Sequence, residues 1–212
     1  MDSINTIFSI IVLIMSVVVH EYAHGFVANK LGDPTAKLQG RLTLNPLKHL
    51  EWFGSFIVPL ITSMVGLGFG WAKPVIINPY NFKNPKRDEL LVALAGPLSN
   101  LILAGFFALV MRFMFSGYVP FSFVSGIYGH ALITIFSIIV LVNITLAIFN
   151  LIPVPPLDGS KVLFTLIPEQ ASKLRENIER FSLIYIIIVI LVIWPIMRPL
   201  IPFLFSLFVG IR

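Results

Sequence analysis

The sequence predicts an all-α polytopic membrane protein with about five to six transmembrane helices. Hydrophobic residues make up 57% of the 212 residues and charged residues only 12%, whereas about 25% charged residues is usual in soluble domains. The mean hydropathy is +0.93. Several apolar stretches approach the roughly 20 residues that cross a bilayer as a helix. Little chain is left for another domain, so we expect residues 1–212 to form one membrane-embedded unit.

The predicted helices follow the apolar stretches in chain order. The first runs from Ile4 to Leu31 and ends at Gly32-Asp33-Pro34, because glycine and proline stop a helix. A polar, strand-prone segment follows over residues 35–50, and a charged, solvated helix is expected over residues 169–180. The later spans are expected at residues 89–115, 129–152 and 181–194, with a short last one at 200–209.

Residues 52–69 form a further apolar run, which Pro59 and several glycines interrupt. Basic residues cluster on both flanks of this run, and Lys and Arg favour the cytoplasmic side of a membrane. We therefore expect a re-entrant or β-hairpin-containing segment that keeps both flanks inside and places the N-terminus outside. The basic residues are Lys30, Lys37, Arg41 and Lys48 before the run, and Lys73, Lys83, Lys86 and Arg87 after it.

Three ionisable residues, His20, Glu21 and His24, interrupt the first apolar stretch in the pattern H-E-x-x-H. A charged side chain near the bilayer centre costs roughly 2.5 to 3.5 kcal/mol, so such residues are functional by default. Residues four apart lie on one face of a helix, which lets both histidines bind the same zinc ion. Glu21 is then placed to act as general base on water at the metal.

A catalytic zinc site needs a third protein ligand, and the best candidate is Asp158. The prolines before it cannot continue the preceding helix, so the chain can bend back, and Gly159 permits a close backbone approach. Pro-Pro-Leu-Asp-Gly alone is also a common turn sequence, but the histidine pair favours a ligand. The first span and the span over 129–152 both run from outside to inside, so the three ligands would meet toward the cytoplasmic side, beside the re-entrant segment.

Further motifs accompany this pattern in an order that spans most of the chain. Together with residues 20–25 they resemble the site-2 protease family of intramembrane zinc metalloproteases, in its small bacterial-type form without a PDZ domain. The resemblance implies that His20, His24 and Asp158 bind Zn²⁺ and that Glu21 is the catalytic general base. The accompanying motifs lie at residues 40–46, 70–75, 95–100 and 150–159.

Substrate binding is predicted at two places. Asn100 begins an apolar stretch, and an unpaired amide is costly in lipid, so its side chain should face the protein interior. The resemblance implies that it donates to the substrate backbone or to the oxyanion, and an interhelical hydrogen bond is an equally open alternative. Leu42, Thr43 and Leu44 could offer an exposed strand to an unwound substrate segment.

The predicted function is that of a zinc-dependent intramembrane endopeptidase that cleaves transmembrane segments of membrane-protein substrates. We expect a multi-pass protein of the cell membrane, with the lipid bilayer as its environment and the active site toward the cytoplasmic side. The net charge of +5 comes from loops between spans, so nucleic-acid binding is not predicted. The absence of cysteine excludes thiolate ligands and disulfides, and the oligomeric state is left open.

Two alternative functions are compatible with the same residues. A divalent-metal transporter also places histidine and acidic residues in helices, but we expect it to show ligands at several depths and internal repeats. An inactive membrane adaptor with the same fold would have no need of a complete set of His20, Glu21, His24 and Asp158.

Overall fold

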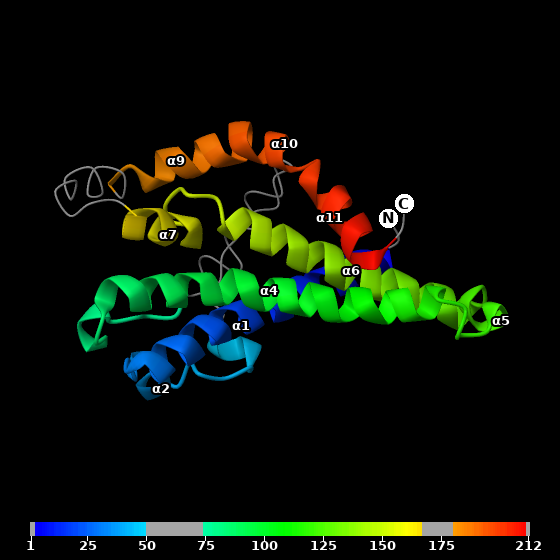
Figure 1. Cartoon of the computed structure of the whole chain (residues 1–212), viewed down its shortest axis with the longest axis horizontal. Coiled ribbons are helices and arrows are strands. Elements are labelled where there is room, and N and C mark those ends of the chain that lie inside the picture. The colour runs from blue at the N-terminus through cyan, green and yellow to red at the C-terminus, as the bar shows by residue number, and fades with distance from the viewer. Residues whose placement is uncertain (1–2, 50–73, 167–179, 211–212) are drawn as a thin grey trace.

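The structure is a computed structural model that describes residues 3–49, 74–166 and 180–210. Three long helices form its centre: α1 (Ser3–Leu31), α4 (Pro85–Phe115) and α6 (Ile127–Asn150). These helices pack side by side, with α1 and α6 running in one direction and α4 in the other (Figure 1). All three are long and apolar enough to cross a membrane, in agreement with the predicted spans.

Small side chains let the central helices approach closely. Ala104 and Ala108 of α4 are buried against Val140 and Ile144 of α6, and close packing of this kind holds helices together in lipid. The opposite face of α4 is apolar and exposed, as lipid contact requires. Its exposed side chains include Ile102, Phe106, Leu109 and Phe113.

The C-terminal part of the chain, where two spans are predicted, forms a series of short helical segments. It consists of α9 (Ser182–Ile188), a π-helical turn η5 (Val189–Ile193), α10 (Trp194–Met197) and α11 (Leu200–Val209). The segments Val189–Met197 and Leu200–Val209 meet at 41°, so they can form one bent span. The break follows from prolines, which lack the N–H group that continues a helix; these are Pro195, Pro199 and Pro202.

The described residues therefore contain three candidate spans, or four if the bent pair is counted as one, and they do not reach the predicted five to six. Residues 52–69 and nearly all of 169–180 lie outside the described part, so the re-entrant segment and the solvated helix stay predictions.

The expected strand over residues 35–50 is not present among the described residues. This stretch instead forms α2 (Thr35–Leu38) and a 3-10 turn, η1 (Pro46–Lys48). The carboxylate of Asp33 accepts a hydrogen bond from the backbone of Thr35, and the side chain of Asn45 accepts one from Leu47. Such local side-chain bonds to the backbone compete with strand pairing. The remaining described elements are η3 (Pro79–Asn81), α5 (Phe121–Val124) and α7 (Asp158–Leu166).

Asp33 joins the end of α1 to the segment that precedes α4. Its side chain is fully buried, and it accepts hydrogen bonds from the backbone N–H of Asn78 at 2.8 Å and from the amide of Asn81 at 2.7 Å. Consequently α2, which carries exposed Lys37, and the start of α4, which exposed Lys83 precedes, lie at the same end of the bundle, whereas α5 lies at the other end (Figure 1).

We predict that Asp33 makes the stability of the fold depend on pH. Burial raises the pKa of Asp33, but the hydrogen bonds from Thr35, Asn78 and Asn81 lower it by more, so its pKa lies below the ordinary value. The carboxylate thus stabilises the fold above the unfolded-state pKa of about 3.9, and this contribution is lost as the pH falls through the lower folded pKa.

Asp33→Asn should lower the free energy of unfolding by about 1–3 kcal/mol at neutral pH, because buried donors lose a charged acceptor. The difference between wild type and variant should shrink below about pH 4. Thermal unfolding of both proteins in detergent with a chelator, at pH 7 and pH 3, measures this. A difference that is the same at both pH values would contradict the prediction.

Candidate metal centre

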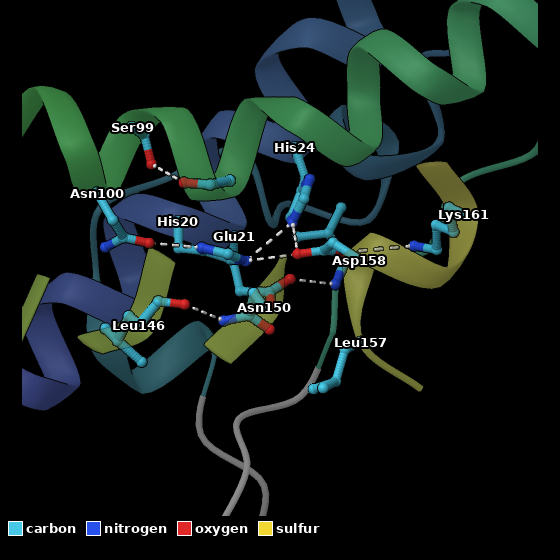
Figure 2. Close-up of polar contacts among 12 residues, drawn as sticks. His20, Glu21, His24, Ser99, Asn100, Leu146, Asn150, Leu157, Asp158 and Lys161 are labelled. Atoms are coloured by element: carbon cyan, nitrogen blue, oxygen red, sulfur yellow. Dashed lines mark hydrogen bonds and ion pairs between the residues drawn. The ribbon is translucent and has the colours of Figure 1, made fainter. Parts of the chain in front are cut away.

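The three predicted metal ligands lie together in the structure, although Asp158 is 138 residues from His20. His20 and His24 project from successive turns of α1, and Asp158 is the first residue of α7 (Figure 2). The Nε2 atoms of the two histidines are 3.0 Å apart, and the Oδ2 atom of Asp158 lies 3.0 Å from one and 3.2 Å from the other. All three side chains are buried.

The other ring nitrogen of each histidine faces an acceptor. Nδ1 of His20 lies 2.6 Å from Oδ1 of Asn100, and Nδ1 of His24 lies 2.7 Å from the backbone carbonyl oxygen of Val92. Both acceptors belong to α4. Because neither oxygen can donate, each Nδ1 carries the proton and each Nε2 of a neutral ring presents a lone pair.

Two imidazole lone pairs and a carboxylate oxygen therefore point at one another, an arrangement that only a cation stabilises. Tetrahedral bonds of about 2.05 Å place ligand atoms about 3.3 Å apart, close to the separations in the structure. Two histidines and a carboxylate form a donor set typical of catalytic zinc, with one position left for water. The residues present thus fit a Zn²⁺ ion.

Asp158 is placed by the preceding turn and by its neighbour on α7. Its second oxygen, Oδ1, lies 3.8 Å from the ammonium group of Lys161, which leaves Oδ2 to face the histidines. The side chain of Asp158 is buried with the two histidines, so Oδ2 has their Nε2 atoms and not water as its neighbours. A Cβ at Gly159 would collide with the carbonyl oxygens of residues 151 and 152, so only glycine lets the chain turn here.

Glu21 lies outside the group of three ligands and contacts a different segment. Its carboxylate accepts a hydrogen bond of 2.8 Å from the backbone N–H of Val75. The neighbouring carbonyl of Pro74 accepts a hydrogen bond of 2.7 Å from Arg41, which follows α2, so this segment is bonded both to α1 and to the residues after α2. A carboxylate that is close to the metal group but not part of it is free to accept a proton.

The residues predicted to bind substrate have different surroundings. Asn100 is fully buried, and its amide bonds within the bundle, to His20 and Asn143. Leu42, Thr43 and Leu44 lie in an irregular segment that is partly exposed, and the carbonyl of Thr43 accepts a hydrogen bond from His49.

Several residues of the site were missed by the sequence analysis. Gly96 lies directly against the two histidines, where a Cβ would be 2.5 Å from Nε2 of His20 and closer still to Nε2 of His24. Glycine before proline inside an apolar helix was the visible signal for a special position, although not for which one. The backbone groups of Val92 and Val75 carry no signal in the sequence, because any residue supplies them.

An apolar helical bundle that holds H-E-x-x-H opposite a third, anionic ligand defines a membrane-embedded metalloendopeptidase. Comparison with known proteins identifies the particular family. Residues 8–194 match Peptidase family M50, and this chain belongs to that family.

Individual relatives agree with the family match. The chain is 40% identical over 197 residues to "Putative zinc metalloprotease YwhC" of Bacillus subtilis, which covers 89% of this chain and 85% of that protein. It is 30% identical over 183 residues to "Putative zinc metalloprotease Rip2" of Mycolicibacterium smegmatis, covering 86% and 65% of the two chains. It is 29% identical over 163 residues to "Putative zinc metalloprotease MJ0611" of Methanocaldococcus jannaschii, covering 74% and 72%. No solved structure matches this chain.

We predict that Gly96→Ala weakens zinc binding by more than tenfold, because the added methyl group would displace both imidazoles from the position at which they can bind one ion. Gly105→Ala is the matched control on the same helix, since its Cβ would make only an ordinary contact, 3.7 Å from Phe208. Competition with a chromogenic chelator measures both affinities. Equal affinities for Gly96→Ala and wild type would show that α4 does not limit the space at the ligands.

Proposed function

We propose that this chain is a zinc-dependent intramembrane endopeptidase that cleaves transmembrane segments of membrane-protein substrates. The observation that carries the proposal is the convergence of His20, His24 and Asp158 within an apolar bundle of helices. Three ligands in an apolar setting fit a catalytic ion that acts on a substrate held in the membrane. Residues 1–212 would then act as a single membrane-embedded metalloprotease domain.

His20, His24 and Asp158 would hold the metal, and Glu21 would move the proton. Zinc, when bound, supplies a Lewis acid that polarises the scissile carbonyl and lowers the pKa of water toward 7. Glu21 takes a proton from the attacking water and passes it to the leaving amine. The hydrogen bond from Val75 holds one carboxylate oxygen of Glu21 in a fixed direction, which reduces the reorganisation needed for proton transfer.

The substrate-binding assignments remain part of the proposal. A transmembrane helix must unwind before its amide can be attacked, and residues 42–44 are partly exposed in a segment without paired strands, where an extended substrate could align. The full burial of Asn100 favours the interhelical alternative for this residue over direct contact with substrate.

The active site would face the cytoplasmic side of the cell membrane. Exposed Lys37 and Lys83 lie at the end of the bundle where α1 terminates, and the positive-inside tendency places such residues in the cytoplasm. The site is nearer to this end, because His20 and His24 fall in the last part of α1. Water would enter from this side.

The transporter alternative is less well supported. Among the described residues, a single group of His, Asp and Glu side chains is arranged for a metal ion. A transport path needs further ligands at other depths, and the described helices supply no second set.

The separate roles of Glu21 and Asp158 predict that two variants both lose cleavage but differ in zinc binding. Glu21→Gln should abolish cleavage of a model transmembrane substrate and leave zinc content nearly unchanged, because glutamine keeps the shape but cannot accept the proton. Asp158→Ala should weaken zinc binding and cleavage together, because the anionic ligand is removed.

Metal content of the purified variants and cleavage in detergent or proteoliposomes provide the two readouts. Wild-type cleavage by Glu21→Gln would remove the general-base assignment. Unchanged zinc affinity in Asp158→Ala would place the third ligand elsewhere.

The orientation is tested by thiol labelling of this cysteine-free chain. Single cysteines at the exposed positions Lys37 and Lys83 should react with an impermeant reagent only from the cytoplasmic side, and one at exposed Ser122, in α5, only from outside. Labelling of Lys37→Cys and Lys83→Cys from opposite faces would show that residues 52–69 cross the membrane fully, and would overturn the re-entrant assignment.

A further inference from the structure

A continuous chain of buried hydrogen bonds runs from the centre of the bundle to His20. Asn143 of α6 donates to the hydroxyl of Ser16 on α1 at 2.9 Å, and its oxygen accepts a bond of 2.7 Å from the amide of Asn100 on α4. The oxygen of Asn100 then lies 2.6 Å from Nδ1 of His20. Ser16, Asn100 and Asn143 are all buried, so these groups have each other and not water as partners.

Two backbone carbonyls determine the direction of every bond in this chain. The Nδ2 group of Asn143 donates to the carbonyl of Ile139 at 2.9 Å, and the Nδ2 group of Asn100 donates to the carbonyl of Ser16 at 3.3 Å. A carbonyl oxygen only accepts, so a flipped amide at either position would bring two oxygens together. The oxygen of Asn100 must therefore face His20, and Nδ1 of His20 must carry the proton.

The two histidines differ in how this protonation is enforced. For His24 the acceptor is a backbone carbonyl, that of Val92, which the helix itself holds in place. For His20 the acceptor is a side-chain amide, which could rotate about its own bonds if nothing held it. Asn143 supplies the shorter of two restraints, because its oxygen accepts from the Nδ2 group of Asn100 at 2.7 Å, whereas the carbonyl of Ser16 accepts from it at 3.3 Å.

We propose that Asn143, supported by Ser16, is a positioning residue that holds Asn100 so that His20 presents Nε2 to the metal. This inference rests on the proposed function, because it assumes that His20 is a zinc ligand. The hydrogen-bonded partner of a metal-bound histidine sets its tautomer and ring orientation, and loss of such a partner typically costs 10–100-fold in metal affinity. Asn143 is one contact further from the metal, so its loss should cost about tenfold.

A purely structural role would give a different result. Polar bonds between helices in lipid contribute modestly to stability, so a variant that only lost such a bond would unfold more easily and bind zinc as before. The proposal instead requires a change at the metal in protein that is still folded.

The experiment compares Asn143→Leu with a control on the same helix. Leucine has nearly the same shape as asparagine but accepts no hydrogen bond from Asn100. Thr134→Val is the control, because the hydroxyl of Thr134 donates to the carbonyl of His130 in its own helix and lies on the exposed surface. Zinc affinity is measured by chelator competition, and Co²⁺ substitution reports ligand geometry through its visible absorption.

Asn143→Leu should bind zinc about tenfold more weakly and shift the Co²⁺ absorption, whereas Thr134→Val should match wild type in both. Asn143→Asp in its neutral form keeps an oxygen that can accept from Asn100 and an O–H that can donate to the carbonyl of Ile139, so it should recover most of the affinity. Ser16→Ala removes one support of Asn143 and should show a smaller loss in the same direction.

A folded Asn143→Leu protein with wild-type zinc affinity and an unchanged Co²⁺ spectrum would overturn the inference. If that variant does not fold, Ser16→Ala decides, and an unchanged affinity and spectrum there would overturn it equally. A failure of the proposed function is distinguishable, because it would appear as retention of zinc by His20→Ala, whatever Asn143 does.

Discussion

Every polar atom inside this apolar bundle has to find its partner within the protein, because lipid offers none. The two Nδ1 atoms of His20 and His24 meet this constraint through oxygens of α4. Their Nε2 atoms and Oδ2 of Asp158 do not, since three acceptors face one another at about 3 Å. A cation would complete the arrangement, which would couple metal binding to the stability of the bundle. The helix packing positions the three side chains, and a bound metal would in turn hold the helices together.

Close backbone approach is the second requirement, and it depends on glycine at points of contact. At Gly96 the helix α4 comes so near the imidazoles that no side chain fits, and at Gly25 the side chains of Ala36 and Val75 approach α1. Gly159 lets the turn after α6 reach the same place. Segments far apart in the sequence can therefore surround the two turns of α1 that carry His20 and His24.

Much of the site could be predicted because its strongest signal is local. H-E-x-x-H needs only the helical repeat, and Asp158 followed from the number of ligands that catalytic zinc takes, together with the parallel course of α1 and α6. The role of Asn100 could not be chosen, because the partner of a buried amide depends on helix rotation that no local pattern records. The strand expected over residues 35–50 was wrong because Asp33 and Asn45 bond to nearby backbone groups. The number of spans stays a prediction, because residues 52–69 lie outside the described part and the prolines between residues 195 and 202 break the last apolar stretch into segments that can form one bent span.

Glu21 shows how one residue can be adjacent to a ligand in sequence and still be kept out of the ligand group. Successive residues on a helix point about 100° apart, so Glu21 lies at the border of the face that carries His20 and His24 and not on it. It meets the backbone of Val75 there. That backbone is anchored on one side by Arg41, through Pro74, and on the other by the buried carboxylate of Asp33, through Asn78. The direction of the Glu21 carboxylate is therefore determined by contacts at the end of α1 as well as by the helix itself. The segment that contacts Glu21 is also the one that Asp33 joins to the end of α1.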